Sequence, residues 1–251
     1  MKQFFVYKLI LVFLLSLVVT LYLIFLINTK DVSFVHFLIV LKQIFTGYSE
    51  AISWGYLIGL GLKTFVVVIL SIFFGIVCAY MLAKWDLKGV MNVIASFPEV
   101  FFLVILWSFY KPVWIPEYKK AFLIVAIESI KSTGVFHKYF HEAFVDYSQS
   151  HSFFLNNIRE INGKWRYTVK NIIGDSLGNM VFEIPLIFSS VAVLEASFSY
   201  VGISQSFFAA IQNSQTDVTM RRSVVILTLL GIIQFVVYYF MFKRDARKVA
   251  G

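Results

Sequence analysis

The sequence is poor in cysteine and in charge. Its single cysteine, Cys78, lies inside an apolar run, which excludes an intramolecular disulfide and a metal cage built from cysteines. Cys78 is expected to be a small packing residue. Charged residues make up 14% of the 251 residues, against 59% hydrophobic and 18% aromatic residues. So much apolar surface cannot be hidden inside one water-soluble globule, and the composition predicts an all-α integral membrane protein.

Motifs for catalysis and for cofactor binding are also missing. The segment GYLIGLGLKT contains glycines before Lys63, but a phosphate-binding loop needs a glycine directly before the lysine and a strand before the loop. Close packing of helices on Gly55, Gly59 and Gly61 is the favoured interpretation. No nucleophile, metal cluster or pair of carboxylates converges in the sequence. The chain is therefore expected to be neither an enzyme nor the holder of a cofactor.

The histidines offer one pair at helical spacing. His137 and His141 stand four residues apart and so share a helix face, but the glutamate of the metalloprotease pattern does not accompany them. His36 and His151 have no histidine at such a spacing. A solvated helix face is favoured over a pair of metal ligands.

Six apolar runs can cross the hydrocarbon core of a bilayer, because about 20 residues at a rise of 1.5 Å cover about 30 Å. A short apolar segment, HFLIVLKQIF, is expected along the outer interface. The predicted organisation is an N-terminal helix with this interfacial segment over residues 1–53, and a five-helix core over residues 54–251. The predicted spans are Tyr7 to Ile27, Gly55 to Leu82, Gly89 to Tyr110, Ala121 to Tyr139, Asn179 to Ile203 and Ser223 to Phe242.

Positive charge orients these spans. The formal charge is +8, but the basic residues lie singly or in pairs at the ends of apolar runs, so nucleic-acid binding is not expected. An excess of lysine and arginine in one set of loops predicts that these loops, both termini and the long polar loop are cytoplasmic in a multi-pass protein of the cell membrane. The predicted inner set is Lys2, Lys8, Lys84, Lys88, Lys138, Arg159, Lys164, Arg166, Lys170, Lys243, Arg244, Arg247 and Lys248, and the outer set is Lys30, Lys42, Lys111, Lys119, Lys120, Arg221 and Arg222.

One long polar interruption, from about Phe136 to Gly178, separates the fourth span from the fifth. It is too short for a catalytic domain and much longer than a turn between two helices needs to be. Its segment IREINGKWRYTVK surrounds two aromatic residues, Trp165 and Tyr167, with charges. An aromatic anchor ringed by charges favours docking to a partner protein, and a basic amphipathic stretch on anionic lipid is the alternative.

Several short motifs suggest a family. The segment VLEASFSYVGI (Val193 to Ile203), followed by Ala210-Ile211, Asn213 and Asp245-Ala246-Arg247, resembles the C-terminal third of the membrane subunits of peptide-type ABC importers. Counting back from Glu195 places Lys170-Asn171 on the Arg-Asn pair of that family. Leu62 and Thr64 resemble its Leu-x-x-Thr opening of the second span, with one residue between them in place of two, and Asp86 and Pro98 resemble the Asp and Pro around the third.

The sequence also departs from the family pattern. Asp175, Val201 and Ala246 stand where the family has proline, and Ser204 stands where it has the second glycine of Gly-Leu-Gly. The loop has no clear Glu-Ala-Ala run. Asp146-Tyr147 aligns with the family's Glu-Tyr, and Gly163 with its glycine, only with an insertion of about two residues. The resemblance is thus to a divergent member.

The resemblance implies a permease subunit of the type I importer fold, with about six transmembrane helices and a cytoplasmic coupling helix within residues 137–178. It implies import of peptides or similar small solutes, driven by separate ABC ATPase subunits. The other implied partners are a second permease subunit, an extracellular solute-binding lipoprotein and membrane lipids. A non-transporting assembly or regulatory subunit on the same scaffold is the alternative. The residues expected in the coupling loop are Asp146, Tyr147, Arg159, Glu160, Gly163, Lys164, Trp165, Arg166 and Asn171.

Carboxylates within the predicted spans are candidates for the translocation path. A carboxylate at bilayer depth costs a few kcal/mol unless it is neutral, paired or faces water. Glu183, with Pro185 two residues on, favours an irregular helix lining a cavity, with Lys63 or Lys131 as a partner. Glu128 and Lys131 share a helix face and either neutralise one another or contact the solute. Glu195 completes this set.

Overall fold

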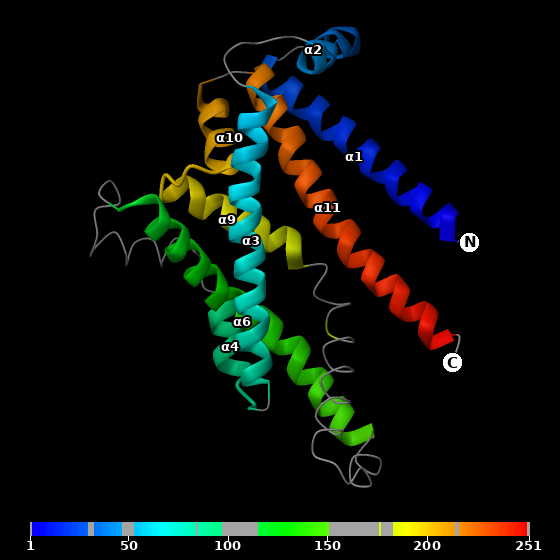
Figure 1. Cartoon of the computed structure of the whole chain (residues 1–251), viewed down its shortest axis with the longest axis vertical. Helices are drawn as coiled ribbons and strands as arrows, with labels where there is room; N and C mark the ends of the chain where they lie inside the picture. Colours follow the sequence, from blue (N-terminus) through cyan, green and yellow to red (C-terminus); the bar gives the residue numbers. More distant parts are fainter. Residues whose placement is uncertain are drawn as a thin grey trace. The chain divides into compact units, whose positions relative to one another are not determined.

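The computed structural model describes residues 2–29, 33–46, 53–83, 85–96, 115–150, 176, 183–213 and 216–249. Within these ranges the chain forms helices and no strand (Figure 1), so the prediction of an all-helical fold is confirmed for this part of the chain. The helices are α1 (Lys2–Thr29), α2 (Phe34–Thr46), α3 (Trp54–Leu82), α4 (Lys88–Ser96), α6 (Glu117–Ser150), α9 (Ile184–Ser197), α10 (Ile203–Gln212) and α11 (Thr216–Val249).

Helix α3 is the one helix within the described ranges that meets a test of length and apolar composition for crossing a membrane. It has 29 residues, and 28% of its most apolar window is buried, whereas the core helix of a soluble protein would be mostly buried. Its exposed side chains include Leu62, Phe73 and Phe74. Cys78 also lies exposed on this helix, so the prediction that it is a packing residue is wrong.

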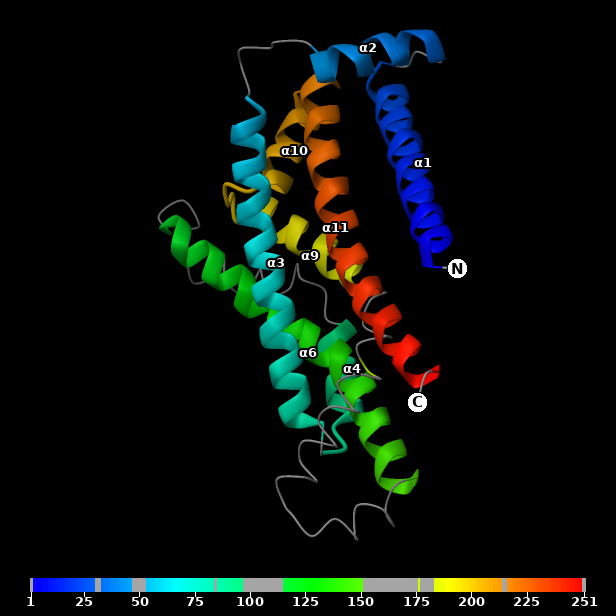
Figure 2. The same cartoon turned by 45° about the vertical axis from the view of Figure 1, so that its right-hand side comes forward.

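The chain divides into two compact units. Unit 1 comprises Met1–Phe65 and Glu195–Ile233. In it, α2 runs across one end of α1 (Figure 2), and the two helices share a cluster of buried side chains that includes Phe25, Phe37 and Ile44. Helix α2 contains the segment HFLIVLKQIF, which was expected along the outer interface. Its remaining face exposes Val35 and Ile39.

A second cluster in unit 1 joins α10 to the first part of α3 and to α11. Its buried members are Leu57, Leu60, Ile203 and Val225. The helices approach closely at Gly61, where an added Cβ would lie 2.9 Å from a methyl group of Val225. Gly59 has open space around it, with nothing within 4 Å of such a Cβ. Close packing on a small residue therefore applies to Gly61 and not to Gly59.

Unit 2 comprises Val66–Leu194 and Gln234–Gly251, and its core cluster joins α6 to the later part of α3 and to Ile187 of α9. Helices α4 and α6 lie side by side in both views (Figures 1 and 2). At Gly134 an added Cβ would lie 2.7 Å from the backbone oxygen of Met91, so only glycine permits this approach. Further along α6, Phe136 and Phe140 pack against Ala79 of α3 and against Ala83, which follows that helix.

Helix α6 is longer than the predicted fourth span. The helix continues from Tyr139 to Ser150, over residues that were assigned to the polar loop. The polar interruption therefore begins with a helix, because Phe136, Phe140 and Phe144 recur at helical spacing and keep an apolar face packed on α3. Asp146 and Tyr147 consequently lie on α6.

The predicted third and fifth spans are described only in part. Helix α4 begins one residue before the predicted third span and ends at Ser96, and Pro98 lies outside the described residues. Helix α9 ends at Ser197, whereas the prediction extended the fifth span to Ile203. The chain turns between these two positions and starts α10, a helix that the sequence interpretation did not include.

Candidate functional site

A cavity of about 380 Å³ lies within unit 2, between α6, α9 and the end of α4. Three of the five side chains predicted for the translocation path, Glu128, Lys131 and Glu183, line it together. The remainder of the lining mixes hydroxyl groups with small and branched apolar side chains. These residues are Ala95, Ser132, Val135, Leu186, Ile187, Ser189, Ser190 and Val193.

Glu128 projects from the middle of α6 and is 1% exposed. Its Oε2 accepts a hydrogen bond from the hydroxyl of Ser190 on α9, and its Oε1 accepts one of 3.5 Å from Ser132, one helical turn further along α6. Burying a carboxyl group without partners would cost several kcal/mol, and these two hydroxyl groups offset part of that cost. The hydrogen bond to Ser190 also joins α6 to α9 across the cavity wall.

Glu183 lies immediately before α9 and is half-buried. The phenol of Tyr139 donates a hydrogen bond of 2.6 Å to its Oε1. Its expected partner was a lysine, and Tyr139 is the partner that the structure adds. Pro185 occupies the first turn of α9, where its missing N–H breaks no helical hydrogen bond. The proline thus helps to fix where α9 begins, next to the glutamate.

Lys131 is half-buried and lines the same cavity one turn from Glu128. The lining therefore combines two carboxyl groups, one amine and three serine hydroxyl groups within mostly apolar walls. A few convergent polar groups in an apolar cavity are typical of small-molecule sites. The arrangement can bind and orient a solute. We see no nucleophile activated by a base among these residues.

Glu195, also predicted for the translocation path, lies in unit 1 and does not line this cavity. It is 0% exposed, and its Oε1 accepts a hydrogen bond of 2.7 Å from the hydroxyl of Thr64. Its Oε2 accepts a hydrogen bond of 3.2 Å from the backbone N–H of Ser204. The backbone N–H of Ile203 donates in turn to the Thr64 hydroxyl at 3.0 Å. Glu195 and Thr64 thus cap the first N–H groups of α10.

The turn between α9 and α10 brings Glu195 to that position. Ser199 has a positive φ of 48°, and its N–H donates to the carbonyl of Ala196 while the N–H of Tyr200 donates to the carbonyl of Glu195. This pair of hydrogen bonds is the Schellman ending of a helix. Gly202 then passes so close that a Cβ there would lie 2.5 Å from the Glu195 carboxyl carbon. Thr64, Glu195 and Gly202 form what we call the capping cluster.

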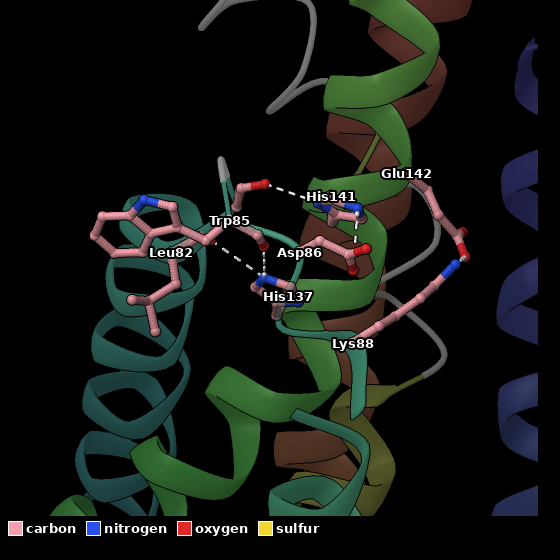
Figure 3. Close-up of polar contacts among 8 residues, drawn as sticks. Leu82, Trp85, Asp86, Lys88, His137, His141 and Glu142 are labelled. Atoms are coloured by element: carbon pink, nitrogen blue, oxygen red, sulfur yellow. Dashed lines mark hydrogen bonds and ion pairs between the residues drawn. The ribbon is translucent and has the colours of Figure 1, made fainter. Parts of the chain in front are cut away.

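His137 and His141 hold the end of α3 to α6 (Figure 3). The Nε2 of His137 lies 3.2 Å from the carbonyl oxygens of both Leu82 and Trp85, and the Nδ1 of His141 lies 2.9 Å from that of Ala83. His137 is fully buried, so the expectation of a solvated face is wrong. Within the described residues, no group of three metal-binding side chains occurs. The pair secures a helix end, because carbonyl groups there lack partners within the helix.

The residues expected to dock a partner lie mostly outside the described residues. This applies to Arg159, Glu160, Gly163, Lys164, Trp165, Arg166 and Asn171. Their role stays a prediction. Of the same set, Asp146 and Tyr147 are placed on α6.

Sequence reasoning missed the hydroxyl groups that support the carboxyl groups. Ser132 could have been found, because it stands four residues after Glu128 on the same predicted helix. Ser190 and Tyr139 had no such signal, since Ser190 is 62 residues from Glu128 and Tyr139 is 44 from Glu183. A search against family models and a search of curated proteins both found no match to this sequence.

Proposed function

We propose that this chain is a permease subunit of an ABC importer of the peptide type, which moves peptides or similar small solutes across the cell membrane. The observation that carries the proposal is the capping cluster. Thr64, Glu195 and Gly202 come from two separate motifs through which the sequence resembles such permeases. They meet in one buried set of contacts.

The capping cluster supports the resemblance because it explains why the motifs need these residue types. A carboxylate at the glutamate position and a hydroxyl at the threonine position accept from N–H groups that would otherwise be unsatisfied. A glycine is needed where the chain crosses the carboxyl group. Unrelated residues that agreed with the motifs by chance would not be expected to contact one another.

The length and composition of α3 support a location in the membrane, and α6 is long enough to cross one although its composition does not meet the same test. Helix α3 has the length and composition of a membrane span. On α6, the strongly exposed Tyr118 and the exposed Glu142 are 24 residues apart, which is about 36 Å along a helix and exceeds the hydrocarbon core of about 30 Å. In the proposed topology Tyr118 lies near the outer surface and Glu142 near the cytoplasm.

The proposed partners follow from the same assignment. Separate ABC ATPase subunits bind the cytoplasmic segment around Trp165, and a second permease subunit and a solute-binding lipoprotein complete the importer. In this arrangement the chain itself neither binds nor hydrolyses ATP. The cavity lined by Glu128, Lys131 and Glu183 contacts the solute on its path.

Replacing Trp165 tests the proposal. Tagged wild-type chain and Trp165→Ala are each co-expressed with candidate ABC ATPase subunits from the same genome and isolated from membranes. Removing a buried aromatic anchor commonly costs about 2 kcal/mol at an interface, which is roughly thirtyfold weaker association. We expect the yield of ATPase to fall accordingly. Tyr118→Ala, an exposed aromatic on the proposed outer side, serves as the matched control and should retain the ATPase.

Two results would contradict the proposal. If the wild-type chain recovers no ATPase from the membrane, the chain is not a permease subunit of this kind. If Trp165→Ala keeps the ATPase but loses affinity for anionic vesicles, the segment lies on lipid and is not the docking element.

A further inference from the structure

We propose that the cavity of unit 2 binds a small solute through an ammonium group held between the carboxyl groups of Glu128 and Glu183. The proposal rests on the proposed function for its biological setting, and it adds the chemical class of ligand that the cavity selects. It is carried by the charge, the hydrogen-bonding capacity and the size of the cavity.

The charges of the lining favour a cation. Glu128 and Glu183 supply two carboxyl groups, and Lys131 supplies one amine. When all three groups are ionised, Lys131 can neutralise only one of the two carboxylates. The negative charge of the other carboxylate then has no opposite charge within the lining. Taking a charge out of water is costly unless an opposite charge meets it. A ligand ammonium group supplies that opposite charge, whereas a ligand carboxylate would meet two groups of its own sign.

The hydrogen-bonding capacity points the same way. An ionised carboxyl group accepts at about four lone-pair positions and donates at none. In the structure Glu128 receives hydroxyl donors from Ser132 and Ser190, and Glu183 receives one from Tyr139. Both groups therefore keep acceptor capacity. An ammonium group has three donors and no acceptor, so it complements the two carboxyl groups that line this cavity.

The size and the walls of the cavity limit the rest of the ligand. A volume of about 380 Å³ lies at the small end of the range of roughly 300–1,000 Å³ for ligand sites. Val135, Ile187 and Val193 form apolar parts of the lining. A compact ligand with a short aliphatic portion next to its ammonium group fits these walls.

Thermal unfolding of the purified full-length chain in detergent tests the inference with three matched probes. Butylammonium chloride carries the cation, sodium butyrate carries an anion on a similar chain, and butanol carries no charge; sodium chloride controls for ionic strength. We expect butylammonium to raise the apparent Tm in a saturable manner and the other three to have little effect. Glu183→Gln and Glu128→Gln should each weaken butylammonium binding about tenfold, because each removes a charge-assisted contact.

Glu142→Gln is the control variant. Glu142 lies on the same helix α6, is exposed and does not line the cavity. The Glu142→Gln variant should bind butylammonium as the wild type does. Equal losses in Glu142→Gln and Glu183→Gln would overturn the proposal, since the attraction would then come from surface charge. A larger effect of butyrate than of butylammonium, or equal effects of butanol or sodium chloride, would overturn it too. The comparison of probes on the wild type holds even if Glu128→Gln does not fold.

The outcome of this experiment is independent of the outcome of the test of the proposed function. Binding of butylammonium without association of an ATPase would preserve the inference about the cavity and remove the importer assignment. Association of an ATPase without selective binding of butylammonium would preserve the importer and remove the ammonium site.

Discussion

Glu195 in unit 1 and Glu128 in unit 2 are both buried glutamates with hydroxyl partners, yet their surroundings differ. Glu195 accepts a hydrogen bond from a backbone N–H group, and its carboxyl group lies so near Gly202 that no Cβ would fit between them. Glu128 accepts hydrogen bonds from serine hydroxyl groups and faces a cavity. From the sequence alone, both glutamates were equal candidates for contact with a solute.

The type of donor separates the two roles. A backbone N–H can only donate, and it has no alternative partner when its acceptor is removed. A carboxyl group that accepts from such an N–H therefore has a structural role. A serine hydroxyl can rotate, donate elsewhere and leave the carboxyl group for a ligand. Burial alone therefore does not identify a functional carboxyl group. A functional carboxyl group is identified by the cavity next to it and by the type of group that donates hydrogen bonds to it.

The largest expected effect is on stability at Glu195. Glu195→Ala leaves the Ser204 N–H and the Thr64 hydroxyl without their acceptor, and it should lower the free energy of unfolding by about 3 kcal/mol. Glu128→Ala should cost only about 1 kcal/mol, because its serine partners border a cavity that water can enter. Unfolding in a detergent titration measures both variants. Equal costs would remove the distinction between the two glutamates.

A second, smaller effect is expected at Gly202. The Cβ of Gly202→Ala would collide with the Glu195 carboxyl group, and the resulting displacement should cost about 2 kcal/mol. In a Glu195→Ala background the obstacle is gone, so the same change at position 202 should cost much less. A double-mutant cycle on unfolding free energies measures this coupling. Additive costs would mean that the contact between the two residues is not what requires glycine.

The smallest effect is expected at Glu183, which has one donor. Tyr139→Phe removes the phenol that donates to Glu183 and should cost about 1 kcal/mol of stability. Butylammonium binding should persist, since the carboxyl group stays in the cavity. Tyr118→Phe, at a strongly exposed tyrosine on the same helix, is the control in the same unfolding assay. If the two tyrosine variants are equally stable, the hydrogen bond to Glu183 contributes nothing measurable.

Composition was enough to predict α3 almost to its ends. The predicted span from Gly55 to Leu82 differs from the helix by one residue. Ser53, whose hydroxyl accepts from the N–H of Tyr56, caps the start of the helix. An uninterrupted apolar run leaves few alternatives to a helix.

The polar character of the residues after Tyr139 left the end of α6 unpredicted. The residues after Tyr139 are charged enough to suggest a loop, yet Phe140, Ala143 and Phe144 continue the spacing set by Phe136. That periodicity was present in the sequence and outweighs mean polarity, because one apolar face is sufficient to hold a helix.

The capping cluster could not be predicted from spacing. Thr64 and Glu195 are 131 residues apart, and nothing local shows that they meet. The positive φ of Ser199, which ends α9 before the predicted limit of the span, likewise has no local signal, since glycine is the usual residue there. In the cavity, Glu128 and Lys131 were predicted to share a helix face, but the approach of α9 with Glu183 and Ser190 is a tertiary event.

The histidines that hold the end of α3 have one more consequence, which concerns the position of a proton. Carbonyl oxygens only accept, so His137 must carry its hydrogen on Nε2 and His141 must carry its hydrogen on Nδ1. The two rings therefore donate to backbone carbonyl groups through different nitrogens, on successive turns of one helix. The other ring nitrogen of His137, Nδ1, is buried with no hydrogen-bond partner in the described residues, while the other ring nitrogen of His141, Nε2, lies 3.9 Å from the Oδ1 of Asp86. Two residues of the same type, four positions apart, are chemically different side chains.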